Sequence, residues 1–527
     1  MIKRILIINI LITLVTGSLF AHIKADKPER VINISYTIEK GPLNEMFKKC
    51  VGAGRANEGL RADWQQQLAY VKKECGFKYI RFHGLLCDDM GVYKEDTKGN
   101  PIYNYMYIDA LFDFLHSIDI KPFVEFGFMP NALASGDNTI FWWKGNVTPP
   151  KDYNKWKDLI SNLTQHWTDK YGEEEVKTWY FEVWNEPNLS PWFWTGTMEE
   201  YFKLYEYTVR GVKSVNSDYR VGGPATAGAA WEDELIEFCE TNDVAIDFIS
   251  THSYGVKQGY LDEFGQMGTV LDRNPMSVSQ DILQSRKEID NSAKPHLELH
   301  YTEWSASYTP ADPIHDSYHE AAFVLQKIKQ SEDAVNSMSY WVFTDIFEEA
   351  GPRFKPFHGG FGMLNTQGIN KPVFYSYQFL NKLRHTELAN KDEMSWITKD
   401  KEGNISALIW DFTITHPGDS VINQIYYTRD LPSKFKGKLN LKIDEIPEGT
   451  YALEVYKVGY RSNDTYTTYL DMGKPANLTK QQVEQIKSQN DGSPFMSEII
   501  HIKKGTNFSK TLDIRENDVF LLNIIKL

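Results

Sequence analysis

The sequence predicts an α/β protein in which a (β/α)8 barrel is followed by an antiparallel β-sandwich. Two observations predict this fold class. Between about residues 48 and 383, short apolar runs alternate eight times with longer amphipathic runs. After residue 383 the pattern changes to segments that alternate apolar and polar residues between turns. The 527 residues exceed one ordinary domain and suit a large barrel with an accessory domain.

Eight apolar runs are the strand candidates of the barrel. They are Lys49–Ala53, Tyr79–Leu85, Pro122–Phe128, Trp179–Asn185, Arg220–Pro224, Ile246–His252, Leu297–Glu303 and Met338–Thr344. The helical candidates that follow them are Asp63–Glu74, Tyr107–Ser117, Tyr153–Tyr171, Glu199–Val215, Trp231–Thr241, Ser277–Asp290, Asp316–Gln330 and Val373–Leu383. Eight such pairs close a barrel. The alternative is a doubly wound open sheet, which is disfavoured because Gly52-Ala53-Gly54-Arg55 lacks the third glycine of a dinucleotide fingerprint.

The C-terminal part reads as a β-sandwich packed against the barrel, because no clear linker follows Leu383. Its strand candidates are Ile405–Trp410, Ile422–Thr428, Lys438–Ile443, Thr450–Val458 and Val519–Ile525, with one helical insert at Leu478–Lys487. The upstream run Arg30–Thr37 is a further strand that could join the sandwich. We therefore divide the chain into 1–25 (signal), 26–41 (N-terminal segment), 42–385 (barrel) and 386–527 (sandwich).

The N-terminus has the three parts of a secretory signal. Lys3 and Arg4 precede an apolar run, and small residues follow it, with cleavage after Ala21 or Ala25. The apolar run is too short for a comfortable membrane span. We expect an exported protein, periplasmic or extracellular, without a stable membrane span once the signal is removed.

Charge and cysteine usage limit the possible partners. The formal net charge of −14 makes nucleic acid an unfavourable partner. The four cysteines, Cys50, Cys75, Cys87 and Cys239, show no zinc-binding spacing, and we assign no disulfide among them. We expect no metal and no cofactor, and the sequence leaves a homo-oligomer open.

Polar residues stand where the predicted barrel strands end, and that rim is where barrel enzymes place their active sites. Glu186 ends the fourth strand and Glu303 ends the seventh. Two carboxylates facing each other across a sugar ring are what glycoside hydrolysis requires, and a separation of about 5–5.5 Å would make the enzyme retaining. We expect Glu303 to stay ionised as nucleophile, and Glu186 to be held protonated by the charge of Glu303.

Other glutamates at strand positions have a plainer explanation. Glu125, Glu182 and Glu298 are expected to be salt-bridge partners. Glu186 differs from them because Asn-Glu-Pro fixes the local backbone, and the Asn185 amide beside it can donate to a sugar 2-hydroxyl. Glu303, in Thr-Glu-Trp, has the weaker local signal of the two.

Several motifs together resemble glycoside hydrolase family 39, and within it the bacterial β-xylosidases. They include Trp184-Asn185-Glu186-Pro187-Asn188-Leu189, Val221-Gly222-Gly223-Pro224, Phe357-His358-Gly359-Gly360-Phe361-Gly362, Arg81-Phe82-His83-Gly84-Leu85-Leu86 and Ser339-Tyr340-Trp341. The resemblance covers nearly the whole chain after the signal and is stronger in the barrel than in the sandwich. Asn-Glu-Pro alone recurs across many barrel glycosidases, whereas the combined set is specific to the family.

The resemblance implies a role for each matching residue. It implies Glu186 as acid/base, Glu303 as nucleophile, and sugar contacts from His83, Asn185, His252, Tyr254, Tyr308, Trp341, Glu348 and Glu349. One departure is Trp304-Ser305-Ala306-Ser307, where the family's xylosidases usually have Tyr-Asn-Thr-Ser. We expect this departure to alter the shell around the nucleophile and the aglycone side.

The leading interpretation is a retaining, exo-acting β-D-xylosidase that releases xylose from the non-reducing ends of xylo-oligosaccharides. Enzymes with the same mechanism on a β-glucoside, an α-L-arabinopyranoside or an α-L-iduronide are the alternatives. A uronide would require a cation for its carboxylate, and no basic residue is convincingly placed for one in the sequence. A carbohydrate-binding protein without catalysis is disfavoured, because both carboxylates are present.

Overall fold

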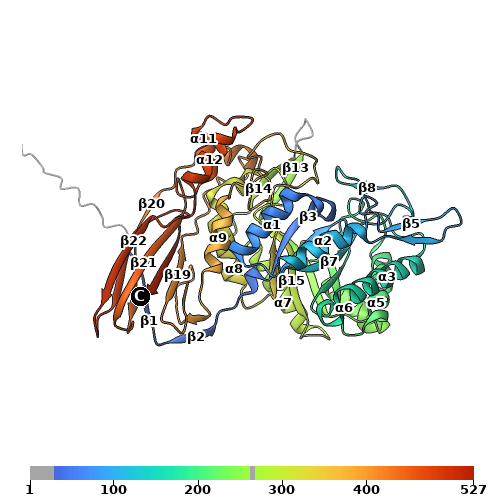
Figure 1. The fold of residues 1–527 in the computed structure, drawn as a ribbon, viewed down its shortest axis with the longest axis horizontal. Helices are drawn as coiled ribbons and strands as arrows, with labels where there is room; N and C mark the ends of the chain where they lie inside the picture. Colours follow the sequence, from blue (N-terminus) through green and yellow to red (C-terminus); the bar gives the residue numbers. More distant parts are fainter. Residues whose placement is uncertain (1–28, 262–266) are drawn as a thin grey trace, which may run out of the picture.

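The computed structural model describes residues 29–261 and 267–527, so the proposed signal segment lies outside the described residues. Eight parallel strands form a closed barrel in the order β3-β4-β7-β10-β11-β12-β15-β16. Figure 1 shows the barrel and its helices beside a separate stack of long strands that contains the C-terminus. The closure confirms the predicted barrel and rules out the open doubly wound sheet.

The barrel strands agree with the predicted runs to within a few residues. They are β3 Cys50–Arg55, β4 Tyr79–His83, β7 Lys121–Phe126, β10 Tyr180–Val183, β11 Arg220–Ala227, β12 Phe248–Tyr254, β15 Glu298–Ser305 and β16 Ser337–Tyr340. The main helices around them are α1 Ala62–Cys75, α2 Met106–Ser117, α3 Tyr153–Tyr171, α5 Met198–Val215, α6 Glu232–Asn242, α7 Ser279–Asn291, α8 Tyr318–Ser331 and α9 Pro372–Asn381.

Helix starts are fixed by the capping chemistry of the sequence. Asp152 accepts hydrogen bonds from the backbone of Asn154 and Lys155 at the start of α3. Thr197 and Glu200 form a reciprocal capping box at the start of α5. Each helix then buries an apolar stripe on the barrel, as α3 does with Trp156, Leu163 and Trp167 among other residues.

The loops of the barrel contain short hairpins and short helices. Three hairpins pair β5 Tyr93–Glu95 with β6 Pro101–Tyr103, β8 Thr139–Ile140 with β9 Gly145–Asn146, and β13 Val256–Leu261 with β14 Met267–Leu271. The remaining short helices are α4 Glu173–Val176 and the 3-10 turns Met46–Lys48, Ala56–Leu60 and Pro313–Asp316.

The accessory region contains two sheets whose apolar faces form one core. The smaller sheet has the order β1-β20-β23 and the larger the order β2-β17-β18-β19-β24-β21-β22. Their bounds are β1 Glu29–Ser35, β2 Glu39–Pro42, β17 Thr386–Leu388, β18 Ser395–Lys399, β19 Ile405–Trp410, β20 Phe435–Asp444, β21 Gly449–Val458, β22 Met496–Ile502, β23 Phe508–Arg515 and β24 Val519–Lys526. The upstream strand β1 does join this stack, and it pairs with β20 in parallel.

One predicted strand of the sandwich was wrong. Residues 422–428 contain the short helix α10 Asn423–Tyr426. The polar side chains there serve a tertiary contact: Asn423 accepts a hydrogen bond from the backbone N–H of Leu271, and Gln424 accepts one from that of Thr269. The insert predicted at 478–487 is the helix α12 Lys480–Gln489, and α11 Thr465–Asp471 precedes it.

The larger sheet packs its second face against the barrel helices. Trp396 and Trp410 are both buried, and their indole N–H groups donate to Glu332 and to Gln326 of α8. These contacts join the two regions through a continuous core. All four cysteines are free and buried. Within residues 29–261 and 267–527, no helix is both long and apolar enough to cross a bilayer.

Candidate active site

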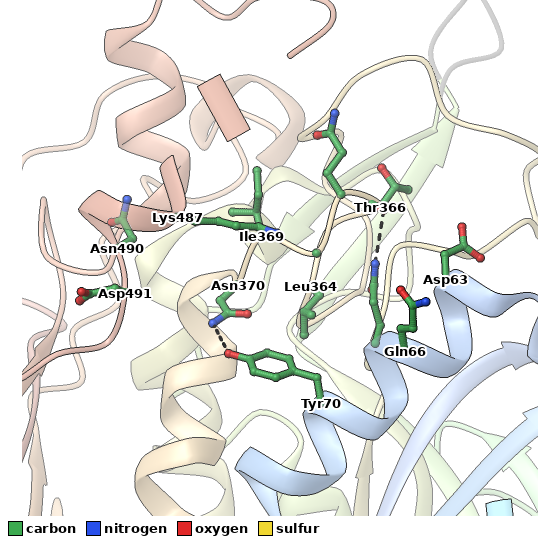
Figure 2. A pocket seen from close by; sticks show the side chains of 13 residues that line it. Asp63, Gln66, Tyr70, Leu364, Thr366, Ile369, Asn370, Lys487, Asn490 and Asp491 are labelled. Carbon is green, nitrogen blue, oxygen red and sulfur yellow. Dashed lines mark hydrogen bonds between the residues drawn. The ribbon is translucent and has the colours of Figure 1, made fainter. Parts of the chain in front are cut away.

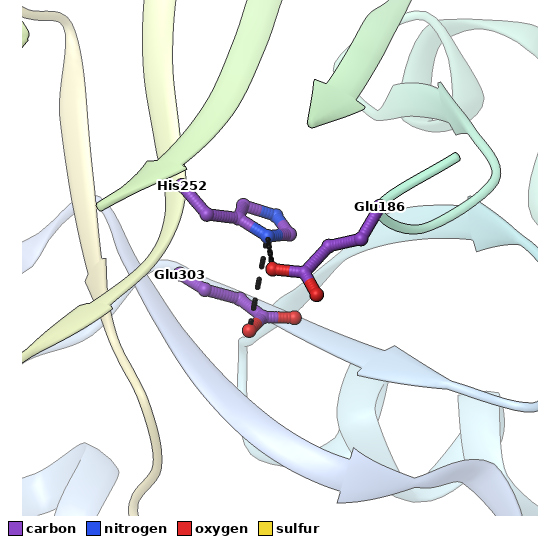
Figure 3. Close-up of side chains that lie close together, drawn as sticks. All are labelled: Glu186, His252 and Glu303. Carbon is purple, nitrogen blue, oxygen red and sulfur yellow. Dashed lines mark hydrogen bonds and ion pairs between the residues drawn. The ribbon is translucent and has the colours of Figure 1, made fainter. Parts of the chain in front are cut away.

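Glu186, His252 and Glu303 come together at the carboxyl end of the barrel, from three different strand ends (Figure 3). Strand register brings two of them side by side, because His252 of β12 pairs with Glu303 of β15 after a bulge at 251–252. A ligand atom of each of the three side chains lies within 4.8 Å of the others. The two carboxylates that the sequence predicts therefore face each other as a pair.

The acid/base candidate Glu186 is held by an unusual backbone. Trp184 and Glu186 adopt φ values of +69° and +47°, which non-glycine residues rarely take. Glu186 donates its backbone N–H to the carbonyl of Ala225 at 2.8 Å. The Asn188 side chain bonds both the carbonyl and the N–H of Ala227. These hydrogen bonds attach the loop that follows β10 to strand β11. They orient the side chain of Glu186 toward the barrel mouth.

The nucleophile candidate Glu303 is held by two donors. Nη1 of Arg81 lies 2.6 Å from its Oε1, and the Tyr254 hydroxyl donates to its Oε2 at 2.7 Å. The two bonds occupy both carboxylate oxygens and fix the orientation of the side chain. Only 5% of Glu303 is exposed, so water does little to weaken these bonds.

Arg81 is the central cation of the site. Its guanidinium is fully buried and also contacts Glu182 at 2.5 Å and Glu125 at 2.9 Å. A fourth contact, from Nη2, reaches Oδ1 of Asn185 at 2.9 Å. Because Oδ1 of Asn185 accepts from Arg81, the amide nitrogen is left to donate, as the predicted contact with a sugar hydroxyl requires.

Burial sets the proton positions in the site. It raises the pKa of Glu186 well above its ordinary value, and the negative charge of Glu303 raises it further. Burial lowers the pKa of His83 to about 3, and that of His252 well below its usual range. Both imidazoles are therefore neutral, and the raised pKa of Glu186 favours its protonated form.

The hydrogen bonds of His252 agree with a protonated Glu186. Thr302 donates its hydroxyl hydrogen to Glu182 at 2.7 Å, so its oxygen accepts from Nε2 of His252 at 3.2 Å. Nδ1 of a neutral His252 then lacks a hydrogen and accepts one from Oε1 of Glu186 at 2.9 Å. This tautomer is assigned from the network of bonds.

His83 and Trp341 line the same recess. Nδ1 of His83 bonds Glu125 at 2.6 Å, and its Nε2 lies 3.4 Å from Glu303. Trp341 is 2% exposed, and its ring centroid is 4.8 Å from that of His83. A Cβ on Gly52 would lie 2.4 Å from the indole, so the ring sits directly on the strand backbone. Trp341 therefore forms a wall of the site.

The two adjacent glutamates of the loop after β16 have different surroundings. Glu349 is half-buried, with one oxygen 3.6 Å from Nε2 of His83, and desolvation raises its pKa well above the ordinary value. Glu348 instead forms ion pairs with Arg55 and Arg61 at 3.2 and 3.1 Å. The structure places Glu349 against the catalytic pair and Glu348 one layer further out.

Tyr308 lies at the entrance rather than inside. It is 45% exposed, and its ring meets that of Tyr254 edge-on with centroids 6.3 Å apart. The altered flank Trp304-Ser305-Ala306-Ser307 is entirely buried, and Trp304 packs on Tyr340 away from the carboxylates. The expected effect of this flank on the aglycone side therefore has no contact in the structure to support it.

Sequence reasoning missed Arg81 and Thr302 as site residues. A usable signal existed for Arg81, because residues 81 and 83 lie on the same face of a strand and both point into the barrel. Glu125 and Glu182 were correctly predicted as salt-bridge partners, and Arg81 is the cation that they share. Glu298, also predicted as a salt-bridge partner, pairs with Lys49 at 3.4 Å.

A separate cavity lies away from this site. It has a volume of about 550 Å³ and is formed by α1, the loop 364–370 and α12 (Figure 2). Amide, hydroxyl and charged groups line it, with Tyr70 and Asn370 joined by a hydrogen bond of 3.0 Å. It holds none of the catalytic candidates.

The cluster Glu186, His252 and Glu303 also has the spacing of a metal site. We assign it to proton chemistry, because the raised pKa of Glu186 favours its protonated form and Glu303 is already bonded by Arg81 and Tyr254. Two carboxylates that face each other in a barrel mouth are the catalytic arrangement of a glycoside hydrolase.

Comparison with known proteins gives the family. The profile described as glycosyl hydrolases family 39 matches residues 30–497, and the chain belongs to this family. A β-xylosidase of Geobacillus stearothermophilus is 40% identical over 84% of this chain and 87% of its own. The crystal structure of the family 39 enzyme from Xanthomonas axonopodis pv. citri superposes with a TM-score of 0.92 at 39% identity, over 97% of this chain and 99% of that one. A monomeric β-xylosidase from Caulobacter crescentus CB15 superposes with a TM-score of 0.91 at 40% identity, over 94% and 100%.

Proposed function

We propose that this protein is a retaining, exo-acting β-D-xylosidase that releases xylose from the non-reducing ends of xylo-oligosaccharides. The observation that supports this most is the short separation of the two carboxylates. One oxygen of Glu186 lies within 4.8 Å of one oxygen of Glu303. Inverting enzymes need about 6.5–9.5 Å between carboxyl groups to seat a water, whereas retaining enzymes need about 5–5.5 Å. The similarity to β-xylosidases at 40% identity supports the choice of sugar.

The proposed reaction has two steps. Glu303 attacks the anomeric carbon while Glu186 gives its proton to the departing oxygen, and a glycosyl ester on Glu303 results. The charge of Glu303 is then gone, so the pKa of Glu186 falls. Glu186 can now take a proton from water, whose oxygen attacks the anomeric carbon and frees Glu303. The enclosed recess, with Trp341 and His83 almost fully buried, suits a single terminal sugar.

Product analysis of xylobiose by NMR tests this proposal. We expect the β-anomer of xylose to appear first, before mutarotation. Initial release of the α-anomer, or no cleavage at all, would contradict it. In Glu303→Ala, turnover should cease and added azide should restore it with an α-xylosyl azide as product.

A uronide is the second candidate, and one observation favours it. Nε and Nη2 of Arg353 are buried, and neither has a hydrogen-bond partner among residues 29–261 and 267–527. Such a cation could accept a sugar carboxylate. Rates on 4-nitrophenyl xyloside, glucoside, arabinopyranoside and iduronide decide between the sugars. If the uronide is the substrate, Arg353→Met should abolish its cleavage, and xyloside should be the poorest substrate.

We also propose that the protein is exported, to the periplasm or the medium. The basis is the N-terminal segment with Lys3 and Arg4 before an apolar run. Cell fractionation with N-terminal sequencing of the product tests this.

A further inference from the structure

The tryptophans of this chain divide sharply by exposure. Of the fourteen, only Trp142 and Trp192 are largely exposed, at 56% and 70%. Both lie on loops that follow adjacent barrel strands, Trp142 after β7 and Trp192 after β10. Exposed apolar side chains gathered at the rim of an active site mark a binding surface.

Ring contacts hold these two loops together. Phe141 and Phe193, the direct neighbours of the two tryptophans, meet edge-on with centroids 5.5 Å apart. The backbone of Thr195 also donates to the carbonyl of Val147 at 3.0 Å. The Phe141 ring in turn stacks near His83, with centroids 6.0 Å apart. The two loops that carry these tryptophans therefore stand directly beside the catalytic recess.

Trp192 is connected to the proton donor through its own loop. Leu189 donates its backbone N–H to the carbonyl of Glu186 at 3.0 Å, and Phe193 donates to that of Leu189 at 2.9 Å. Leu189 is itself 37% exposed. Glu186 must protonate the glycosidic oxygen, so the leaving group has to pass along this side of the site.

Trp142 lies on the other of the two loops. Its backbone N–H donates to the carbonyl of Glu349 at 2.8 Å, and its indole lies against the backbone of Gly351, where a Cβ would come within 3.1 Å. The indole is therefore fixed in place before any ligand arrives, which lowers the entropy cost of binding.

We propose that Trp142 and Trp192 form the leaving-group subsite, an aromatic platform for the apolar face of a neutral pyranose ring. The inference rests on the proposed function and adds to it the residues that select the leaving group. Indole faces are electron-rich, and the C–H face of a xylosyl ring is a suitable partner for them. The same platform would bind the sugar that attacks the glycosyl enzyme in place of water.

Reactivation of a trapped glycosyl enzyme tests the platform apart from the first chemical step. Wild type, Trp142→Ala and Trp192→Ala are labelled with 2-deoxy-2-fluoro-β-xylosyl fluoride, and mass spectrometry counts one label per chain. Recovery of activity is then followed in buffer alone and with xylobiose as acceptor. The ratio of the two rates isolates the acceptor site. Phe495→Ala is the control, because Phe495 is 51% exposed but lies outside the barrel, just before β22.

We expect the ratio to fall roughly three- to tenfold in each tryptophan variant and to keep the wild-type value in Phe495→Ala. Trp142→Phe and Trp192→Phe should recover most of the loss, and they replace any alanine variant that fails to take the label. Equal ratios in all variants would overturn the platform while leaving the proposed function intact. Failure of wild type to take the label would remove the proposed function, and this inference with it.

Discussion

The imidazole of His252 bridges Glu186 and Thr302, with its two nitrogens 2.9 and 3.2 Å from their oxygens. Thr302 thereby fixes which nitrogen of His252 bears the hydrogen, although it does not itself reach Glu186. The bridge presents a bare nitrogen to Glu186 and so favours the protonated acid.

Replacing Thr302 with valine should shift the pH dependence of the enzyme. Without the threonine oxygen, Nε2 of His252 loses its acceptor, and the hydrogen moves to Nδ1. That hydrogen would bond the ionised form of Glu186, so the pKa of Glu186 falls. Activity requires protonated Glu186 and is lost as pH rises through this pKa, so the basic limb of kcat/KM should move to lower pH.

Thr164→Val is the matched control for this change. Thr164 is also fully buried, and its hydroxyl has no hydrogen-bond partner in the part of the chain that the structure describes. Its pH profile should match that of wild type. A basic limb that stays in place in Thr302→Val would contradict the role assigned to the bridge.

Replacing Arg81 with methionine should cost stability as well as activity. The change leaves Glu125, Glu182 and Glu303 buried without their shared cation. Removing one partner of a buried ion pair typically costs about 3–5 kcal/mol. The thermal midpoint should drop, and calorimetry measures it.

The same variant should regain part of this stability as the pH falls. Burial raises the pKa of Glu125 to about 8 and Arg81 is the charge that lowers it, so this pKa should rise further without the cation. Stability from such a group is present at low pH and is lost as pH rises through the folded-state pKa, so the deficit against wild type should be largest in alkaline buffer and shrink as the pH falls toward 8. A deficit independent of pH would argue that lost packing, and not charge, is the cause.

Replacing Tyr254 with phenylalanine removes one of the two donors to Glu303. A hydrogen bond to a charged group contributes about 1.5–3 kcal/mol, which corresponds to a loss of roughly 10- to 100-fold in kcat/KM. Steady-state kinetics on 4-nitrophenyl xyloside measure it. Tyr451→Phe, whose hydroxyl bonds the Pro447 carbonyl in the sandwich, should keep wild-type rates. Equal rates in both variants would show that Arg81 alone suffices to hold the nucleophile.

Replacing Glu186 with alanine should affect substrates according to their leaving groups. A poor leaving group such as the xylosyl unit of xylobiose needs the proton, and its cleavage should slow by about 10²–10⁴-fold. Formation of the glycosyl enzyme from 2,4-dinitrophenyl xyloside needs no proton and should slow far less. Stopped-flow measurement of dinitrophenolate release separates these cases, and an equal loss for both would exclude Glu186 as the acid.

The sequence was sufficient for the barrel and for the placement of Glu186 and Glu303 at one end of it, because strand periodicity and strand-end position are local properties. It failed at 422–428, where an apolar run suggested a strand but Asn423 and Gln424 bind a distant hairpin. It also placed Glu348 and Glu349 together in the sugar site. Their side chains differ in surroundings because Arg55 and Arg61 hold Glu348, and neither arginine stands out by motif.

The contacts of Arg81 with several site residues were missed for a related reason. Its four partners come from three other strand regions, and only the closed barrel brings them to one point. The reaction itself predicts that the pKa of Glu186 depends on the charge of Glu303. It does not predict the tautomer of His252. That tautomer depends on the direction in which Thr302 donates, which only the fold determines.

The parallel pairing of β1 with β20 has a consequence for biosynthesis. Glu29 lies opposite Lys438 and Ser35 opposite Asp444, so the first strand of the described chain is completed by one made more than 400 residues later. A ribosome releases the barrel segments well before that partner exists. β1 therefore stays unpaired until β20 has been made, and any chain that stops short of residue 435 leaves it without its neighbour. The first strand of the described chain is thus one of the last that can dock, and a native β1 marks a chain that has been synthesised past β20.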